Sequence, residues 1–127
     1  MSGDRAITLL IAALGGEGGG VLADWIVNAA RASDHPVQAT SIPGVAQRTG
    51  ATTYYIEIWP KPWPELGTRT PVMALNPAVG EIDLMVASEF LECGRAIQAG
   101  FVTPERTLLV TSNSRVYSTA EKMAMAD

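Results

Sequence analysis

The sequence is poor in the residues that build metal sites and poor in basic charge. It contains one cysteine, Cys93, and one histidine, His35, which are too few for a Cys/His zinc site or an iron–sulfur cluster. Nine basic residues against 13 acidic ones give a net charge of −4, which argues against nucleic acid as a partner. We therefore expect no metal ligands here, and a metal or cluster function would have to lie on another subunit.

Long apolar runs are also missing, since none reaches the roughly 18 residues that indicate a membrane span. Residues 1–14 resemble a secretory signal, because Arg5 precedes a short apolar stretch. However, Asp4 offsets that charge, and the stretch leads directly into glycines and a well-patterned helix. A lone cysteine fits a reducing compartment. We predict a cytoplasmic protein with no membrane contact.

The sequence does contain enough apolar residues to form the core of one domain. Its 127 residues are 47% hydrophobic and 17% charged, so residues 1–127 can form a single core without disulfides. Residues 7–14 form a buried-strand pattern, and after six residues rich in glycine an amphipathic helix is expected to end near Ser33. Its predicted buried face consists of Val21, Leu22, Trp25, Ile26 and Ala29.

Two further strands are expected in the middle of the chain. Residues 37–42 follow the first helix, and this strand–helix–strand order favours parallel pairing with the first strand through a right-handed crossover. Residues 51–59 are β-branched or aromatic, and we place this strand nearer a sheet edge, with Glu57 reaching solvent. Residues 60–80 contain five prolines and no clear element, and Trp59 and Trp63 are predicted at a surface that could contact a partner.

A second strand–helix unit occupies the last third. Residues 83–87 predict a strand, and a helix stopping at Gly100 should bury the face made by Phe90, Cys93, Gly94 and Ile97. Residues 107–111 predict another strand, and residues 118–121 have the spacing of a helix capping box. The sequence stops six residues after this box, which suggests a truncated domain. The predicted fold class is α/β, with an open, mostly parallel Rossmann-like sheet and flanking helices.

The strand–glycine–helix order makes the glycine turn a candidate ligand site, because glycines expose backbone N–H groups and a helix N-terminus attracts anions. Residues 18–23 match G-x-G-x-x-A, but no acid closes the second strand to hold a ribose, and Glu17 adds negative charge. The alternative is a tight strand-to-helix turn that serves only helix–sheet packing and binds no ligand. The candidate binding residues are Gly15, Gly16, Gly18 and Gly19 in this turn, with Gln47 and Arg48 in the loop after the second strand.

No catalytic set is recognisable. Without a second histidine and without a Ser or Cys nucleophile in an elbow motif, no triad can be proposed. Cys93 is predicted to be a small core residue, and His35, before a proline, an exposed turn residue. Asp83 and Glu89 are interpreted as strand-terminal and helix-capping residues rather than an acid/base pair. We assign no catalytic residues.

Two loops together resemble a known family. Residues 13–18 are similar to the Gly-x-Gly-Gly-Gln-Gly turn, and residues 46–50 to the Ala-Gln-Arg-Gly-Gly loop, of the gamma-type domain of 2-oxoacid:ferredoxin oxidoreductases. The resemblance is nearest to the beta subunit of indolepyruvate ferredoxin oxidoreductase and covers nearly the whole chain. Three positions depart from the pattern: Ala13, Glu17 and Thr49 replace a glycine, a glutamine and a glycine.

The resemblance implies a component, inactive alone, of an enzyme that oxidatively decarboxylates an aryl 2-oxoacid such as indolepyruvate to its acyl-CoA, with ferredoxin as acceptor. It implies that thiamine diphosphate and iron–sulfur clusters are bound by partner subunits, that coenzyme A is a co-substrate, and that the chain packs against the thiamine-binding part. It also implies a domain that continues beyond Asp127. The alternative from the residues alone is a free-standing nucleotide-binding module.

Overall fold

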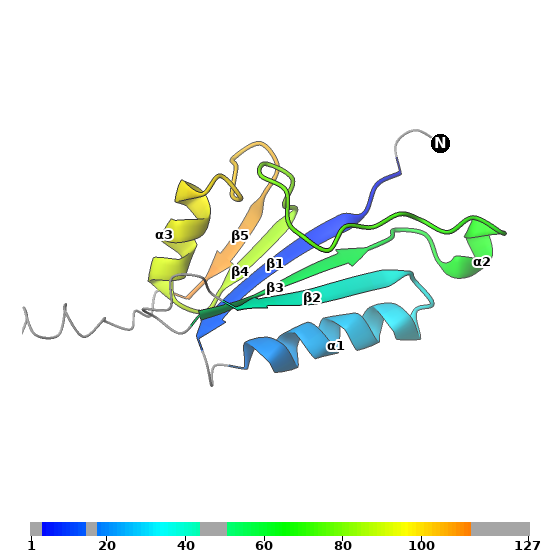
Figure 1. Cartoon of the computed structure of the whole chain (residues 1–127), viewed down its shortest axis with the longest axis horizontal. Helices are drawn as coiled ribbons and strands as arrows, with labels where there is room; N and C mark the ends of the chain where they lie inside the picture. The colour runs from blue at the N-terminus through cyan, green and yellow to red at the C-terminus, as the bar shows by residue number, and fades with distance from the viewer. Residues whose placement is uncertain (1–3, 15–17, 44–50, 113–127) are drawn as a thin grey trace, which may run out of the picture.

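The computed structural model describes residues 4–14, 18–43 and 51–112, and these form a five-stranded sheet with helices on both faces (Figure 1). The strands and the two long helices fall where the hydrophobic pattern predicts them. Residues 60–80 contain only a four-residue helical turn, α2. The elements in chain order are β1 (Ile7–Leu14), α1 (Gly19–Ala32), β2 (Val37–Pro43), β3 (Ala51–Ile58), α2 (Trp63–Leu66), β4 (Leu84–Ala87), α3 (Phe90–Gln98) and β5 (Leu108–Thr111). The predicted capping box at residues 118–121 lies outside the described residues.

The strand order is β2-β3-β1-β4-β5. β1, β4 and β5 pair in parallel, whereas β3 is antiparallel to both β1 and β2. Four of these five strands therefore run in one direction, which confirms the open, mostly parallel α/β sheet. The predicted direct pairing of β1 with β2 is wrong, because β3 folds back along β2 and inserts between them. β3 thus lies one strand in from the β2 edge.

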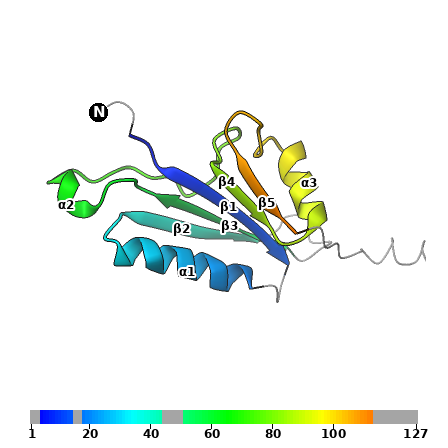
Figure 2. The ribbon, with the colours of Figure 1, turned by 180° about the vertical axis from the view of Figure 1, so that it is seen from behind.

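The sheet has two packed faces with a helix on each (Figure 1; Figure 2). α1 lies against β1, β2 and β3, and the cluster beneath it consists of Leu9, Ile11, Ala23, Val27 and Ile56. α3 lies against β4 and β1 on the other face. Its cluster consists of Leu10, Ala12, Tyr55, Ile82, Met85, Ala87, Cys93 and Ala96. Cys93 is buried, as predicted.

The buried faces of both helices differ from the predicted ones. In α1 the residues against the sheet are small or β-branched, namely Gly19, Ala23, Val27 and Ala30, while Val21 and Trp25 are exposed. In α3, Glu92 and Ala96 are buried beside Cys93, while Phe90 and Ile97 are about half exposed. Small side chains let a helix approach the sheet closely, so the bulkiest apolar residues are displaced to the flanks and outer face.

The segment between β3 and β4 is tied to the rest of the chain through backbone groups. The Trp59 amide donates to the Pro36 carbonyl at 2.9 Å, and the Trp63 amide donates to the Asp34 carbonyl at 2.8 Å. His35 is half-buried rather than exposed, with Nδ1 at 2.7 Å from the Trp59 carbonyl oxygen. Trp63 is exposed, as predicted, but Trp59 is half-buried.

No helix among the described residues is both long enough and apolar enough to cross a membrane.

Candidate functional site

The carboxyl edge of the sheet brings together the two loops that carry the candidate binding residues. Leu14 pairs with Ala51, and Pro43 pairs with Thr52, so the end of β1, the end of β2 and the start of β3 are neighbours. The glycine turn leaves β1 here, and the loop 44–50 begins and ends here. Gly15, Gly16, Gln47 and Arg48 themselves lie outside the described residues. Ligands of open α/β sheets bind at such carboxyl edges.

The described end of the glycine turn is a close-packed helix start. Gly18 has φ +79°, a left-handed conformation that favours glycine, and its carbonyl accepts the Leu22 amide at 2.9 Å. A Cβ on Gly19 would lie 2.5 Å from the Ala13 Cβ and 3.1 Å from Tyr54 Cε2. The predicted packing role is therefore confirmed at Gly19, which lets α1 begin directly on β1 and β3. Whether Gly18 and Gly19 also bind a ligand stays a prediction.

The two helices that begin at this edge are capped differently. Glu89 is almost fully buried and caps α3, its carboxylate accepting the Glu92 amide at 3.1 Å. This confirms the interpretation of Glu89 as a cap. α1 has Gly18 at its N-cap, and no side chain among the described residues makes a capping hydrogen bond there. The N-terminus of α3 thus already holds an anion of its own, whereas the binding of an anion at the start of α1 stays a prediction.

The inserted strand also bears on dinucleotide binding. In the dinucleotide-binding fold the ribose acid stands at the end of the strand next to β1. Here β3 occupies that position in the opposite direction, and β2 lies two strand spacings, about 10 Å, from β1. This geometry disfavours a dinucleotide across the glycine turn.

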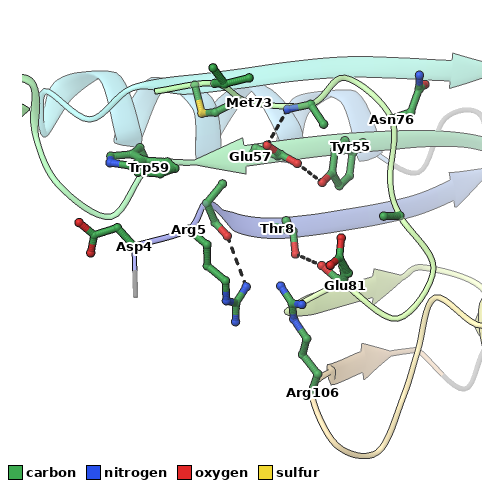
Figure 3. A pocket seen from close by; sticks show the side chains of 14 residues that line it. Asp4, Arg5, Thr8, Tyr55, Glu57, Trp59, Met73, Asn76, Glu81 and Arg106 are labelled. Atoms are coloured by element: carbon green, nitrogen blue, oxygen red, sulfur yellow. Dashed lines mark hydrogen bonds between the residues drawn. The ribbon is translucent and has the colours of Figure 1, made fainter. Parts of the chain in front are cut away.

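The opposite, amino edge holds a cavity of about 460 Å³ that the sequence did not predict. Thr8 of β1 and Tyr55 and Glu57 of β3 form one wall, and the segment that includes Met73 and Asn76 crosses over them (Figure 3). The expectation that Glu57 reaches solvent is wrong, since only 7% of it is exposed.

Glu57 is buried because its carboxylate has partners in two segments. It accepts the Ala74 amide at 2.8 Å and the hydroxyl hydrogen of Tyr55 (Figure 3). Burial and the hydrogen bond to Glu57 raise the pKa of Tyr55 above its ordinary value. These contacts make Glu57 an anchor that holds the segment 72–78 over the sheet.

Beside this cavity, Asp83 links three parts of the chain. Its Oδ1 lies 3.1 Å from Arg5 Nη2 and 2.9 Å from Arg106 Nε, and its Oδ2 accepts the Thr8 amide at 2.9 Å. Burial alone would raise the pKa of Asp83, but the hydrogen bonds from Arg5, Thr8 and Arg106 outweigh it and lower the pKa to about 2. Asp83 therefore connects the N-terminal segment, β1 and the residues before β5 through its charged carboxylate at the start of β4.

The family model for pyruvate ferredoxin/flavodoxin oxidoreductase matches residues 8–124. The chain belongs to this family. The match includes both the glycine turn and the loop 44–50. None of the curated proteins matches the chain significantly.

Solved structures of 2-oxoacid:ferredoxin oxidoreductases and their subunits share the fold. A 2-oxoglutarate:ferredoxin oxidoreductase from Magnetococcus marinus, with 2-oxoglutarate, coenzyme A and succinyl-CoA bound, is similar over 89% of this chain (TM-score 0.63, 12% identity). The pyruvate oxidoreductase subunit PORC from Thermotoga maritima is similar over 89% (TM-score 0.59, 17% identity). The gamma subunit of a keto/oxoacid ferredoxin oxidoreductase from Geobacter sulfurreducens is similar over 84% (TM-score 0.50, 15% identity).

The part of this pyruvate ferredoxin/flavodoxin oxidoreductase family member given by the sequence covers only part of each relative's length. The chain spans 18%, 53% and 61% of the three solved chains, respectively. The described residues contain no group of three His, Cys, Asp or Glu side chains that could hold a metal ion.

Sequence reasoning missed the residues of the amino edge for a simple reason. Arg5 and Asp83 are 78 positions apart, and Arg106 is a further 23 positions along. No local pattern links residues at such distances. The one usable signal for Glu57 was its position among β-branched and aromatic residues, where a buried charge requires partners.

Proposed function

We propose that this chain is a component, inactive alone, of an enzyme that oxidatively decarboxylates an aryl 2-oxoacid to acyl-CoA and passes electrons to ferredoxin. The family match over residues 8–124 carries the proposal. The structural neighbours, which include a 2-oxoglutarate:ferredoxin oxidoreductase and two oxidoreductase subunits, support it through their shared fold. The lone cysteine agrees with the reducing cytoplasm as the place of this reaction.

The redox and thiamine chemistry is assigned to partner subunits. An iron–sulfur cluster does not fit the described residues. Cys93, a residue of α3, is buried, and the described residues contain no group of three or more His, Cys, Asp or Glu side chains that could bind metal. We therefore derive no step on this chain through a cluster or through thiamine diphosphate.

The part we assign to this chain is the contact with an anionic group at the carboxyl edge. The turn that holds Gly15, Gly16, Gly18 and Gly19 and the loop that holds Gln47 and Arg48 both start there. An arginine guanidinium binds a phosphate or carboxylate through two parallel hydrogen bonds. We assign to Arg48 a phosphate of coenzyme A or the carboxylate of the 2-oxoacid, with α1 contributing its N-terminus, where the N-cap residue Gly18 has no capping side chain.

Reconstitution with the thiamine-binding subunit tests the proposal. We expect no 2-oxoacid-dependent dye reduction by the chain alone and clear activity in the assembly. Replacing Arg48 by alanine should raise the KM for coenzyme A or for the 2-oxoacid about tenfold or more with a smaller change in kcat, and Arg48→Lys should recover part of the loss. Activity in the isolated chain would contradict the proposal.

The aryl substrate rests on the resemblance of the two loops to the indolepyruvate enzyme. Comparing kcat/KM of the assembly for indolepyruvate, pyruvate and 2-oxoglutarate tests it separately. We expect indolepyruvate to be preferred. A preference for pyruvate or 2-oxoglutarate would remove the aryl assignment and leave the component role standing.

A further inference from the structure

One edge of the sheet offers a long strand to a neighbour. β2 stands at the end of the strand order, and it has seven residues, whereas β5 at the other end has four. Within the described part of the chain, no strand pairs with the outer side of β2. Charged side chains commonly protect an edge strand from pairing with another chain, but residues 37–42 carry no charge. The outer side of β2 is therefore open to a further strand.

The free hydrogen-bonding groups on this side belong to alternate residues of β2. The register of β2 with β3 continues to Pro36, whose carbonyl accepts the Trp59 amide at 2.9 Å. Residues of an antiparallel strand alternate between bonding their partner and facing away from it, so the N–H and C=O groups of Val37, Ala39 and Ser41 face outward. The side chains of Ala39 and Ser41 are small and exposed, which leaves room for a neighbouring strand.

The flank of α1 beside this edge carries an acid and a base. A groove of about 200 Å³ between α1 and β2 is lined by Asp24 on the helix and by Ala39 and Ser41 on the strand. Asn28 and Arg31, four and seven positions after Asp24, lie on the same flank. All three helix residues are exposed. Neither Asp24 nor Arg31 forms an ion pair within residues 4–14, 18–43 and 51–112.

A two-fold axis at Ala39 makes this edge complementary to itself. α1 runs antiparallel to β2 (Figure 1), and the groove places helix residues 23–27 beside strand residues 39–41. With about 1.5 Å per helical residue and about 3.3 Å per strand residue, the midpoint between Asp24 and Arg31 lies beside Ala39. A second copy turned about an axis there pairs its β2 antiparallel to the first, and Asp24 of each copy faces Arg31 of the other.

The spacing of the layers permits these charge contacts. α1 lies on β1, β2 and β3, and so is centred near β3. In the paired sheets the two β3 strands would be three strand spacings apart, about 14 Å. At this separation the two helices do not pack directly against each other, but the long side chain of Arg31 can reach a carboxylate on the facing flank.

We propose that two copies of this chain pair through their β2 edges about a two-fold axis at Ala39. The two five-stranded sheets then become one continuous sheet, and Asp24 of each copy binds Arg31 of the other. A second copy is favoured over an unrelated strand because the acid and the base lie at equal distances, about 5 Å, on either side of the axis. The carboxyl edges of the two copies face opposite directions. This inference does not depend on the proposed function.

Sedimentation velocity of the full chain over a range of concentrations tests the pairing. We expect wild type to be a dimer at about 100 μM. Ala39→Glu places two carboxylates directly opposite each other at the axis and should raise the Kd of the dimer more than tenfold. Ala78→Glu is the matched control at an exposed alanine between α2 and β4, and it should change the Kd less than about twofold.

Charge reversal tests the position of the axis. Asp24→Arg and Arg31→Asp should each raise the Kd about fivefold or more, because each brings like charges together across the axis. The double variant Asp24→Arg/Arg31→Asp restores opposite charges and should return the Kd to within about threefold of wild type. Far-ultraviolet circular dichroism of all variants should match wild type, since the substituted side chains are exposed.

Three results would overturn the proposal. The first is a wild-type chain that stays monomeric at about 100 μM. The second is a dimer whose Kd is unchanged by Ala39→Glu, since the two copies would then meet elsewhere. The third is a double charge reversal that dimerises no better than the single variants, because Asp24 and Arg31 would then not face each other.

Discussion

The two edges of the sheet are built from different chemical groups. At the carboxyl edge α1 begins on Gly18 and Gly19, and none of the side chains in residues 4–14, 18–43 and 51–112 caps it. At the amino edge the carboxylates of Asp83 and Glu57 are both engaged by groups from other segments. Side chains that satisfy one another stabilise a fold but offer little to a ligand, whereas the described glycines at the start of α1 provide no side-chain cap for its backbone N–H groups. We infer that the amino edge serves stability and the carboxyl edge serves binding.

The largest effect is expected from a side chain at Gly19. Gly19→Val should lower the free energy of unfolding by about 3 kcal/mol, because the new Cβ meets Ala13 on β1 and α1 has to move. Urea unfolding measures this. Gly20→Ala is the control, since its Cβ would lie 3.2 Å from the Tyr54 hydroxyl, which can shift. We expect a change within about 0.5 kcal/mol there. Equal effects at the two glycines would contradict the packing role.

The second-largest decrease in the free energy of unfolding is expected from Asp83→Asn at neutral pH. The side chain is 21% exposed, and its pKa falls from the ordinary 3.8 to about 2 in the folded protein. This difference corresponds to about 2 kcal/mol of stability, which the asparagine loses. Chemical unfolding at pH 7 measures the loss. An unchanged stability would show that the Arg5 and Arg106 contacts contribute nothing at this edge.

The same carboxylate predicts a pH dependence. Because the folded-state pKa of Asp83 is depressed, its contribution is fully present above about pH 4 and is lost as the pH falls toward 2. The free energy of unfolding of wild type should therefore approach that of Asp83→Asn across this window. Parallel curves for the two proteins between pH 5 and about 2 would rule out Asp83 as the titrating group.

The smallest effect is expected from Glu57→Gln, at about 1 kcal/mol, since the amide oxygen can still accept the Ala74 amide. Glu57→Ala should cost more, because it leaves that amide and the Tyr55 hydroxyl without their partner. In the reconstituted assembly, Glu57→Gln should leave the KM for coenzyme A unchanged. A raised KM would contradict the division of roles between the edges.

Most of the elements could be predicted from the sequence, since each rests on local pattern. The apolar run of residues 7–14 and the β-branched and aromatic residues of 51–58 mark strands, and the glycine turn marks the start of α1. Glu89 was correctly read as a cap because capping depends on residues three positions apart.

Sheet order could not be predicted in the same way. Whether β2 pairs with β1 or leaves room for β3 depends on contacts among three strands, and the helix between β1 and β2 suggested the simpler arrangement. The predicted helix faces were wrong in part for a related reason. Trp25 and Phe90 are apolar and were expected to be buried, but close packing on a sheet selects alanine and glycine, so both are exposed. The candidate residues Gln47 and Arg48 remain predictions from the loop pattern.

The insertion of β3 also sets the order in which the chain can acquire its contacts during synthesis. β1, α1, β2 and β3 lie within residues 7–58 and share one apolar cluster, whereas the parallel partner of β1 follows much later, with Leu9 pairing with Leu84. At roughly 5–20 residues per second, about 4–15 seconds separate these two residues on the ribosome. The first three strands and α1 can assemble in that interval, and one side of β1 then remains an unpaired edge until β4 emerges.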